Sequence, residues 1–175
     1  MSKATALSIS VGIFGMLSTW MTATLWALPV WVLFLAWASF FFVGSGPSGL
    51  LKSVACNWTG IGIATLTLLS VNQTTSALLL SVAVGIGSLA MVQVSRLKWI
   101  SATPAIVFGF AMTVGTIAAT GNGVTTSGVS NPALIAATTA LVGAGFGIAS
   151  EWGAEVLGRL AGLMGKPTAA AGQPA

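Results

Sequence analysis

The chain has 175 residues, of which 55% are apolar and 5% are charged: six Lys or Arg, two Glu, and no Asp or His. A soluble domain of average composition carries about 25% charged residues, so this composition excludes a water-facing surface and indicates a chain that faces lipid. The lack of His and Asp excludes most metal sites and nearly all catalytic dyads, so we expect no enzyme, no metal site, no catalytic residue and no cofactor.

Hydropathy predicts six apolar segments, at residues 6–24, 28–43, 50–70, 77–95, 100–119 and 132–150. Each approaches the length of about 20 residues that a helix needs to cross the hydrocarbon core. Backbone groups in lipid must be bonded internally, and the period-two alternation of barrel strands is missing, so the segments are predicted to be helices. The prediction is an all-α polytopic membrane protein with six transmembrane helices.

These helices form one predicted transmembrane domain over residues 1–165. Residues 151–165 either extend the sixth helix or lie in the membrane interface. Residues 166–175, rich in Ala, Pro and Gly, are expected to be a disordered tail. The first segment has the features of a signal peptide, with Lys3 before an apolar stretch, but its similarity to a later segment argues that it is retained.

The basic residues predict the orientation. They precede the first helix, fall in the second and fourth connections, or follow the sixth helix; they are Lys3, Lys52, Arg96, Lys98, Arg159 and Lys166. The other three connections carry no charge. Positive charge marks the cytoplasmic side of a membrane, so both termini are predicted to be cytoplasmic. No five-residue window holds more than two of these charges, which argues against a nucleic-acid partner.

The two halves of the chain resemble each other. At an offset of 73 positions, residues 11–13 (Val-Gly-Ile) match residues 84–86. At an offset of 85 positions, residues 60–64 match residues 145–149. Three helices in each half imply that the second half enters the membrane inverted, a plan common in channels and transporters. The alternative is chance similarity between apolar sequences rich in Gly and Ile.

Small and polar residues recur at helical spacing within several segments and suggest a narrow solute path near the midplane. The predicted path residues are Ser8, Gly12, Ser53, Asn57, Gly60, Ser81, Gly85, Thr138 and Gly145. Asn57 is the strongest of them, because an amide at that depth must find a partner or water. The alternative is that small residues simply allow helices to approach closely.

Three further features have competing interpretations. The tripeptide Asn131-Pro132-Ala133 occurs in water channels, but it also suits an ordinary helix start with Asn131 as N-cap. Pro104 is predicted to lie within the fifth helix and to kink it. Glu151, at the end of the sixth helix, is either a proton or ion ligand or a solvated charge, and residues 155 and 159 suit an i,i+4 ion pair.

A family resemblance rests on three stretches: residues 43–53 (VGSGPSGLLKS) followed by Asn57-Trp-Thr-Gly60, residues 102–109 (ATPAIVFG), and the small-residue helix over 141–150. Across residues 6–158 the chain resembles the YcdZ-like bacterial inner-membrane proteins, a family of unknown function. The resemblance implies a bacterial inner-membrane location and carries over no site residues.

The expected function is a channel or facilitator for a small, uncharged solute, because the stripes carry no charge at mid-membrane. The alternative is a membrane scaffold or partner subunit that transports nothing. The expected partners are the lipid bilayer and the solute. A homo-oligomer is also predicted, with the pairs Gly143/Gly147 and Gly158/Gly162 as contact faces.

Overall fold

The computed structural model describes residues 2–72 and 74–164, and every regular element in them is helical. The helices are α1 (Lys3–Thr24), α2 (Val30–Phe42), α3 (Gly46–Ser70), α4 (Ala77–Val94), α5 (Thr103–Thr120) and α6 (Pro132–Met164), with short 3₁₀ turns η1 (Lys98–Ile100) and η2 (Gly128–Ser130). The predicted all-α class is confirmed. The predicted tail, residues 166–175, lies outside the described residues.

Five of these helices are long and apolar enough to cross a membrane, namely α1, α3, α4, α5 and α6. The chain is therefore a membrane-spanning helical protein in its described part. The sixth, α2, has 13 residues and rises about 20 Å, which is less than the hydrocarbon thickness of about 30 Å. It is nevertheless strongly buried, with Val32, Leu33 and Ala36 fully enclosed.

Local chemistry sets several helix ends. The Ser2 hydroxyl accepts a hydrogen bond from the Thr5 N–H (3.1 Å) and caps α1, and Ser76 caps α4 in the same way. Pro47 and Pro104 lie in the first turns of α3 and α5, where a missing N–H costs nothing. The predicted kink at Pro104 is therefore wrong, because α5 begins at Thr103.

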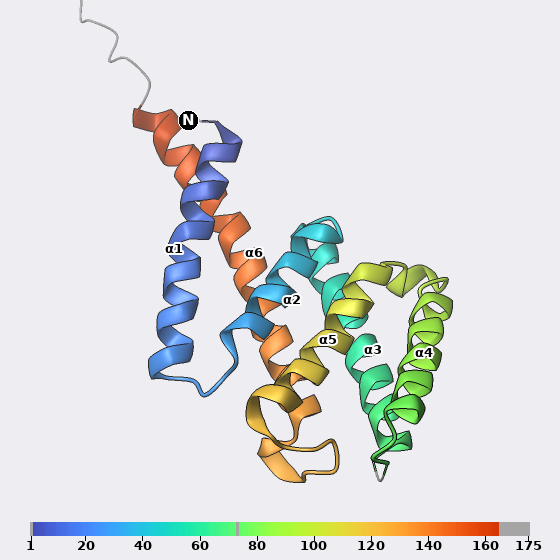
Figure 1. Ribbon diagram of the computed structural model, residues 1–175. Coiled ribbons are helices and arrows are strands. Elements are labelled where there is room, and N and C mark those ends of the chain that lie inside the picture. Colours follow the sequence, from blue (N-terminus) through green and yellow to red (C-terminus); the bar gives the residue numbers. More distant parts are fainter. Residues whose placement is uncertain (1, 73, 165–175) are drawn as a thin grey trace, which may run out of the picture.

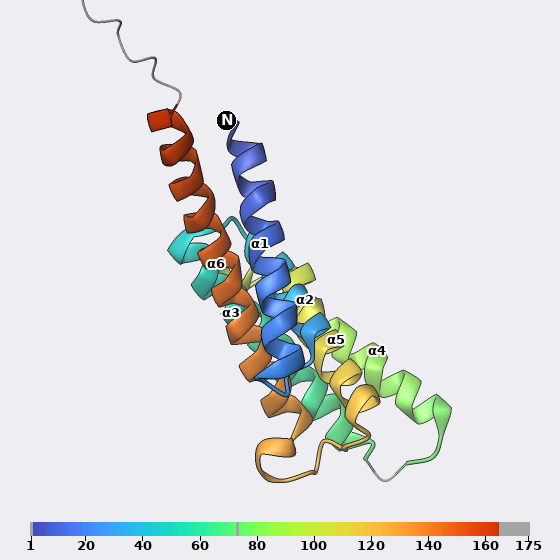
Figure 2. The ribbon, with the colours of Figure 1, turned by 90° about the vertical axis from the view of Figure 1, so that its left-hand side faces the viewer.

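α6 continues for 33 residues to Met164, so the residues after 150 extend the sixth helix. Figures 1 and 2 show that the helices alternate in direction, and that the start of α1 lies beside the end of α6. The turns that join α2 to α3 and α4 to α5 lie toward that same end of the bundle. The long loop before α6 lies at the opposite end.

The helices of the two halves are interleaved. α2 packs mainly on α6, and α5 packs mainly on α3, while α3 and α6 also meet at the centre. α1 and α4 are edge helices: α1 packs on α6 and α4 packs on α3 (Figure 1). The core is thus formed by α2, α3, α5 and α6, each of which lies between others.

Glycines allow the core backbones to meet. A Cβ placed on Gly60 would lie 1.8 Å from the Ile106 carbonyl oxygen, and one on Gly109 would lie 1.9 Å from the Asn57 carbonyl oxygen, so α3 and α5 are in backbone contact. A Cβ on Gly143 would lie 2.2 Å from the Leu33 carbonyl oxygen, where α6 meets α2. Close approach at small residues increases van der Waals contact where no hydrophobic drive exists in lipid.

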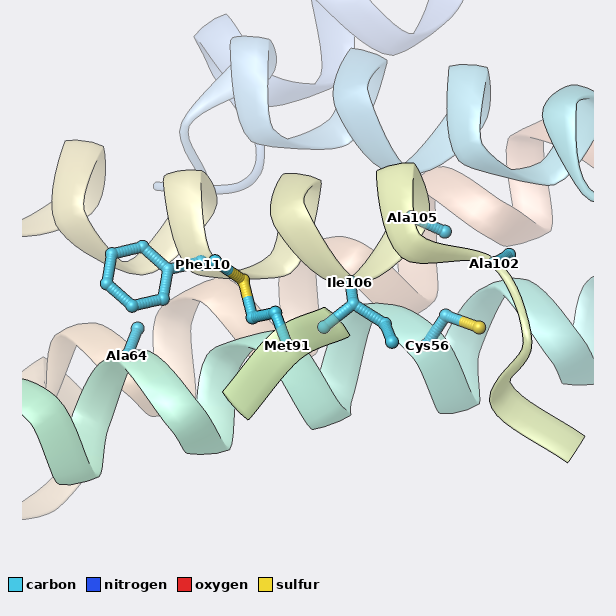
Figure 3. Close-up of a cluster of buried hydrophobic side chains, with 7 residues drawn as sticks. All are labelled: Cys56, Ala64, Met91, Ala102, Ala105, Ile106 and Phe110. Atoms are coloured by element: carbon cyan, nitrogen blue, oxygen red, sulfur yellow. The ribbon is translucent and has the colours of Figure 1, made fainter. Parts of the chain in front are cut away.

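Two apolar clusters fill the spaces beside these contacts. In the first, shown in Figure 3, side chains of α3 and α5 point toward one another, and Met91 of α4 closes the side; the members are Cys56, Ala64, Met91, Ala102, Ala105, Ile106 and Phe110. The second joins all four core helices through Val32, Ala36, Ile61, Met112, Ala136 and Ala140. Both clusters combine alanine with a few larger side chains such as Ile106 and Met112.

Candidate functional site

A chain of three polar side chains lies inside the helix core. The Ser53 and Ser39 hydroxyls are 3.0 Å apart, and the Asn57 amide Nδ2 donates to Ser53 Oγ at 3.5 Å. All three residues have zero exposed surface. The carbonyl oxygen of the amide, Asn57 Oδ1, has no hydrogen-bond partner among the described residues.

Three helices position this group. Ser53 and Asn57 stand one turn apart on α3, so both face the same neighbours. Ser39 is the one hydroxyl residue in the sequence of α2. Gly109 of α5 lies against the Asn57 backbone and covers it from the other side. The result is a small polar site in an apolar bundle, with hydroxyls that donate and accept and an amide oxygen that only accepts.

Such a site suits a particular chemistry. A buried acceptor left without a donor costs about 1–3 kcal/mol, so any small molecule that brings an N–H or O–H group to Asn57 Oδ1 would recover part of that energy. The site offers no charge to a cation or an anion, because Ser39, Ser53 and Asn57 are all neutral.

The structure divides the nine predicted path residues into two groups. Ser53, Asn57 and Gly60 are buried together on one face of α3. The other six lie away from that face: Ser8, Gly12, Ser81, Gly85 and Thr138 are exposed, and Gly145 is half-buried. The structure therefore brings three of the nine predicted path residues together and leaves the other six outside that group.

The reason is helix placement. α1 and α4 are edge helices, and their small-residue stripes face away from the bundle. The hydroxyls of Ser8 and Ser81 donate to their own helices, at the carbonyl oxygens of Ala4 and Ala77 (2.9 Å each). A polar stripe has the same spacing whether it faces a path, a partner or lipid, so spacing alone did not separate these cases.

A second buried polar group was not predicted. Ser10 of α1 donates to the Ser150 carbonyl oxygen (2.7 Å), and Trp37 Nε1 of α2 donates to the Ser150 hydroxyl (3.1 Å). Ser150 thereby joins α6 to both α1 and α2. One available signal was Trp37, since an indole N–H inside an apolar helix must find an acceptor.

Glu151 has a structural partner. Its Oε2 accepts a hydrogen bond from the Gly46 N–H at 2.8 Å, at the first turn of α3. The turn before α3 holds positive φ at Gly44, Ser45 and Gly46 (117°, 60° and 67°), a conformation that glycine tolerates and serine rarely adopts. A carboxylate at a helix N-terminus is favoured by the helix dipole, so Glu151 fastens the start of α3 to α6.

Asn131 is also explained by local structure. Its Oδ1 accepts from the N–H groups of Ala133 and Leu134 (2.9 and 3.2 Å), which confirms the N-cap. Its Nδ2 donates to two carbonyl oxygens of the preceding loop, at Val124 and Thr126 (3.2 and 2.7 Å). The ordinary helix start therefore accounts for the whole side chain, and neither amide hydrogen is left for a solute.

Comparison with known families gives one match. The model of a family described as "Protein of unknown function (DUF1097)" matches residues 8–155, well over half of the chain. The chain belongs to that family. No curated protein and no solved structure matches the chain.

The DUF1097 match covers the whole core, from the edge helix α1 to the Ser150 and Glu151 contacts on α6. Because the family is described as of unknown function, it assigns no role to Asn57 or to any other residue.

Surface hollows lie at the edges of the bundle. One of about 440 Å³ is formed by α3 and α4 beside Thr67 and Gly87. Another of about 690 Å³ is bounded by Trp26, Asn122 and Thr138. A third, of about 720 Å³, lies between the start of α1 and the end of α6. None of these three hollows reaches Ser39, Ser53 or Asn57, so the buried polar group is closed in this conformation.

Proposed function

We propose that this protein is a membrane facilitator for a small, uncharged solute that passes Asn57. The observation that carries the proposal is the Asn57 amide oxygen, fully buried and without a partner among the residues described. Polar groups inside a membrane bundle are costly and usually functional. A purely structural core would gain stability by replacing this amide with an apolar side chain.

The distribution of charge supports an uncharged solute. The charged residues that the structure describes lie in the first two turns of α1 or α3, in the α4–α5 connection, or in α6 beyond its apolar run: Lys3, Lys52, Arg96, Lys98, Glu151, Glu155 and Arg159. Coupled transport of ions or protons usually requires an ionisable residue within the membrane. A neutral Ser and Asn site instead recognises hydrogen-bonding groups, as in urea or glycerol.

An inverted repeat of three plus three helices is part of the proposal. The repeat makes α1 equivalent to α4, α2 to α5 and α3 to α6. The packing supports these equivalences, because α2 packs on α6 and its equivalent α5 packs on α3. In the same way, α1 packs on α6 and its equivalent α4 packs on α3. The glycine contacts agree with this exchange of halves: Gly143 meets Leu33 and Gly60 meets Ile106. Leu33 and Ile106 stand 73 positions apart, the offset found in the sequence.

The same contacts revise one detail of the register. Gly60 and Gly143 are 83 positions apart, whereas the sequence match paired Gly60 with Gly145. Apart from its own helical turn, no described atom lies within 4 Å of a Cβ placed on Gly145, so Gly145 is not a packing equivalent of Gly60. In the proposed repeat, the short α2 crosses the membrane as the counterpart of α5.

We further propose that the chain is a YcdZ-like protein of the bacterial inner membrane, with both termini in the cytoplasm. The five described basic residues, Lys3, Lys52, Arg96, Lys98 and Arg159, belong to the start of α1, the start of α3, the α4–α5 connection and the end of α6. These elements lie toward one end of the bundle (Figure 1). A single basic flank is what the positive-inside rule expects of the cytoplasmic side.

The second candidate function is a scaffold or partner subunit that transports nothing. The backbone contacts of Gly60 with Ile106 and of Gly109 with Asn57 favour it, because they hold α5 against α3 beside the polar group. A facilitator would have to separate these helices during each passage. Both candidates predict a stable closed state, so only flux distinguishes them.

The test measures flux in liposomes that contain the purified protein. Stopped-flow light scattering follows the uptake of urea, glycerol and water by the unmodified protein and by the Asn57→Leu variant. Leucine has the same number of side-chain heavy atoms in a similar branched shape, but it is bulkier and has no hydrogen-bonding group. We expect solute-dependent uptake to fall at least about tenfold, because loss of one hydrogen-bonding partner in a site that must replace hydration water is worth at least about 1.4 kcal/mol.

Thr138→Val is the matched control, since Thr138 is exposed on α6 and bonds only to its own helix. Its flux should equal that of the unmodified protein. Equal rates for empty liposomes and liposomes with unmodified protein would refute the facilitator and leave the scaffold. Flux that survives in Asn57→Leu would place the path elsewhere.

A further inference from the structure

The hollow between the start of α1 and the end of α6 contains charged side chains of both signs. It has a volume of about 720 Å³ and is open to one side of the bundle, where the two helix ends lie together (Figures 1 and 2). Its lining residues are Ser2, Lys3, Ala6, Leu7, Glu151, Ala154, Glu155, Gly158 and Arg159. The volume falls within the range of about 300–1,000 Å³ typical of small-molecule sites.

The closed end of this groove is fixed by the Ser10 contact. Ser10 donates to the Ser150 carbonyl oxygen, and a Cβ on Gly153 would lie 2.5 Å from the Ser10 hydroxyl, so α1 and α6 touch there. Lys3 stands seven residues before Ser10, about 10 Å along α1. Glu155 and Arg159 stand five and nine residues beyond Ser150, about 8 and 14 Å along α6. The charged groups therefore surround the groove at similar heights.

Helix length sets the depth of the groove in the membrane. α6 has 33 residues and rises about 50 Å, which exceeds the hydrocarbon thickness of about 30 Å. The apolar run of α6 ends at Ser150, and the first charge of the helix is Glu151. The groove thus opens at the level of the lipid head groups, where phospholipid is the most abundant molecule.

The lining matches a head group that carries both charges. Two cations, Lys3 and Arg159, face two carboxylates, Glu151 and Glu155, so the formal charge of the lining is zero. The Arg159–Glu155 pair is long, at 3.5 Å, and both side chains are mostly exposed, so each retains capacity for another partner. A primary ammonium can donate to the carboxylates while a phosphate accepts from the cations.

We propose that this groove binds a phospholipid with a primary-ammonium head group. The phosphate lies between Lys3 and Arg159, the ammonium meets Glu155, and the glycerol portion rests on the small apolar side of the groove at Ala6, Ala154 and Gly158. Glu151 adds negative potential while it holds the Gly46 N–H. This binding site is independent of the solute path at Asn57.

The test is lipid retention measured by native mass spectrometry of the full chain in detergent. Equal amounts of phosphatidylethanolamine, phosphatidylcholine and phosphatidylglycerol with identical acyl chains are the probes. We expect the unmodified protein to retain the ethanolamine lipid about fivefold more than the choline lipid, because a trimethylated ammonium donates no hydrogen bonds.

Two charge variants give opposite expectations. Glu155→Gln leaves the lining with a surplus of positive charge, so the preference should move toward the anionic glycerol lipid by about fivefold. Arg159→Gln removes one cation and should lower retention of that anionic lipid by a similar factor. Lys98→Gln is the control, since Lys98 lies in η1, outside the groove, and should retain lipids as the unmodified protein does.

The proposal fails if the unmodified protein retains the three lipids equally, or if both groove variants keep its order of preference. The same spectra report oligomeric state. A dimer that is lost in Glu155→Gln would show that a second copy of the chain covers the groove, which would also overturn lipid binding. Elution volume and helicity of each variant establish that the fold is intact.

Discussion

Glycines inside the bundle and glycines on its edge helices have opposite environments despite similar surroundings in the sequence. Gly60 and Gly109 meet the backbone of a neighbouring helix so closely that no side chain fits. Gly12 and Gly85, on α1 and α4, are exposed, and no described atom outside their own helical turns lies within 4 Å of a Cβ placed on either. All four stand in apolar segments with small or polar residues one turn away.

This difference shows that a small-residue stripe does not reveal its own role. In the core, glycine permits backbone contact between α3 and α5 and buries the Asn57 group. On the edge helices, the same residue type is exposed on the outer surface and makes no contact with another helix. The Gly143/Gly147 pair resembles the glycines inside the bundle, because it packs against Leu33 and Phe40 of α2. Its predicted role as an oligomer face is therefore wrong.

The largest effect is expected for a methyl group added inside. Gly60→Ala or Gly109→Ala forces α3 and α5 apart, because the new Cβ would meet a carbonyl oxygen that cannot move away alone. Overpacking costs about 1–3 kcal/mol and occasionally more, and these contacts with rigid backbone belong at the upper end. Thermal unfolding in detergent, followed by circular dichroism, measures the loss.

Unchanged stability of Gly60→Ala would contradict the backbone contact between α3 and α5 at this glycine. Substitution at Gly145 is the matched control, because Gly145 occupies the same sequence pattern on α6 but has open space at its Cβ. We expect Gly145→Ala to be tolerated.

The next effect concerns the polar link between α2 and α6, in which the Ser150 hydroxyl accepts from Trp37. Ser150→Ala leaves the Trp37 indole N–H without its acceptor, and an orphaned buried donor costs about 1–3 kcal/mol. Ser88→Ala on α4 is the comparison, since its exposed hydroxyl bonds only to the Val84 carbonyl oxygen. Equal melting temperatures for these two variants would show that the Ser150 network adds no stability.

A smaller effect is expected at the start of α3. Glu151→Gln keeps an acceptor for the Gly46 N–H but removes the negative charge from the helix N-terminus. The expected loss is about 0.5–1 kcal/mol. Glu155→Gln should change the unfolding free energy by less, because the Glu155–Arg159 pair is exposed and such pairs contribute little. Chemical denaturation of both variants side by side checks the order.

The smallest change in stability is expected for substitutions on the edge helices, and it should be a gain. Gly12→Ala and Gly85→Ala meet open space, and alanine favours a helix by up to about 1 kcal/mol over glycine. Both variants should therefore unfold at an equal or slightly higher temperature. A marked loss would mean that these faces are covered by another copy of the chain, which native mass spectrometry would then detect.

Much of the architecture was predictable from local sequence. Each predicted segment contains most of one helix, and the N-cap at Asn131 and the place of Pro47 in the first turn of α3 follow from residue type. Other features were not predictable. The partner of Glu151 is a backbone N–H 105 positions away, and the acceptor of Trp37 lies 113 positions away, so no local pattern contains either pair.

The sequence by itself determined that the chain is a helical membrane protein. Eight charged residues are too few for the surface of a water-soluble protein, and a backbone in lipid must form its hydrogen bonds internally. Only the tertiary structure decided which polar residues are buried. Asn57 and Ser81 both follow helical spacing, yet α3 lies between other helices and α4 lies at the edge. Burial is a property of neighbouring helices, and those neighbours come from distant parts of the chain.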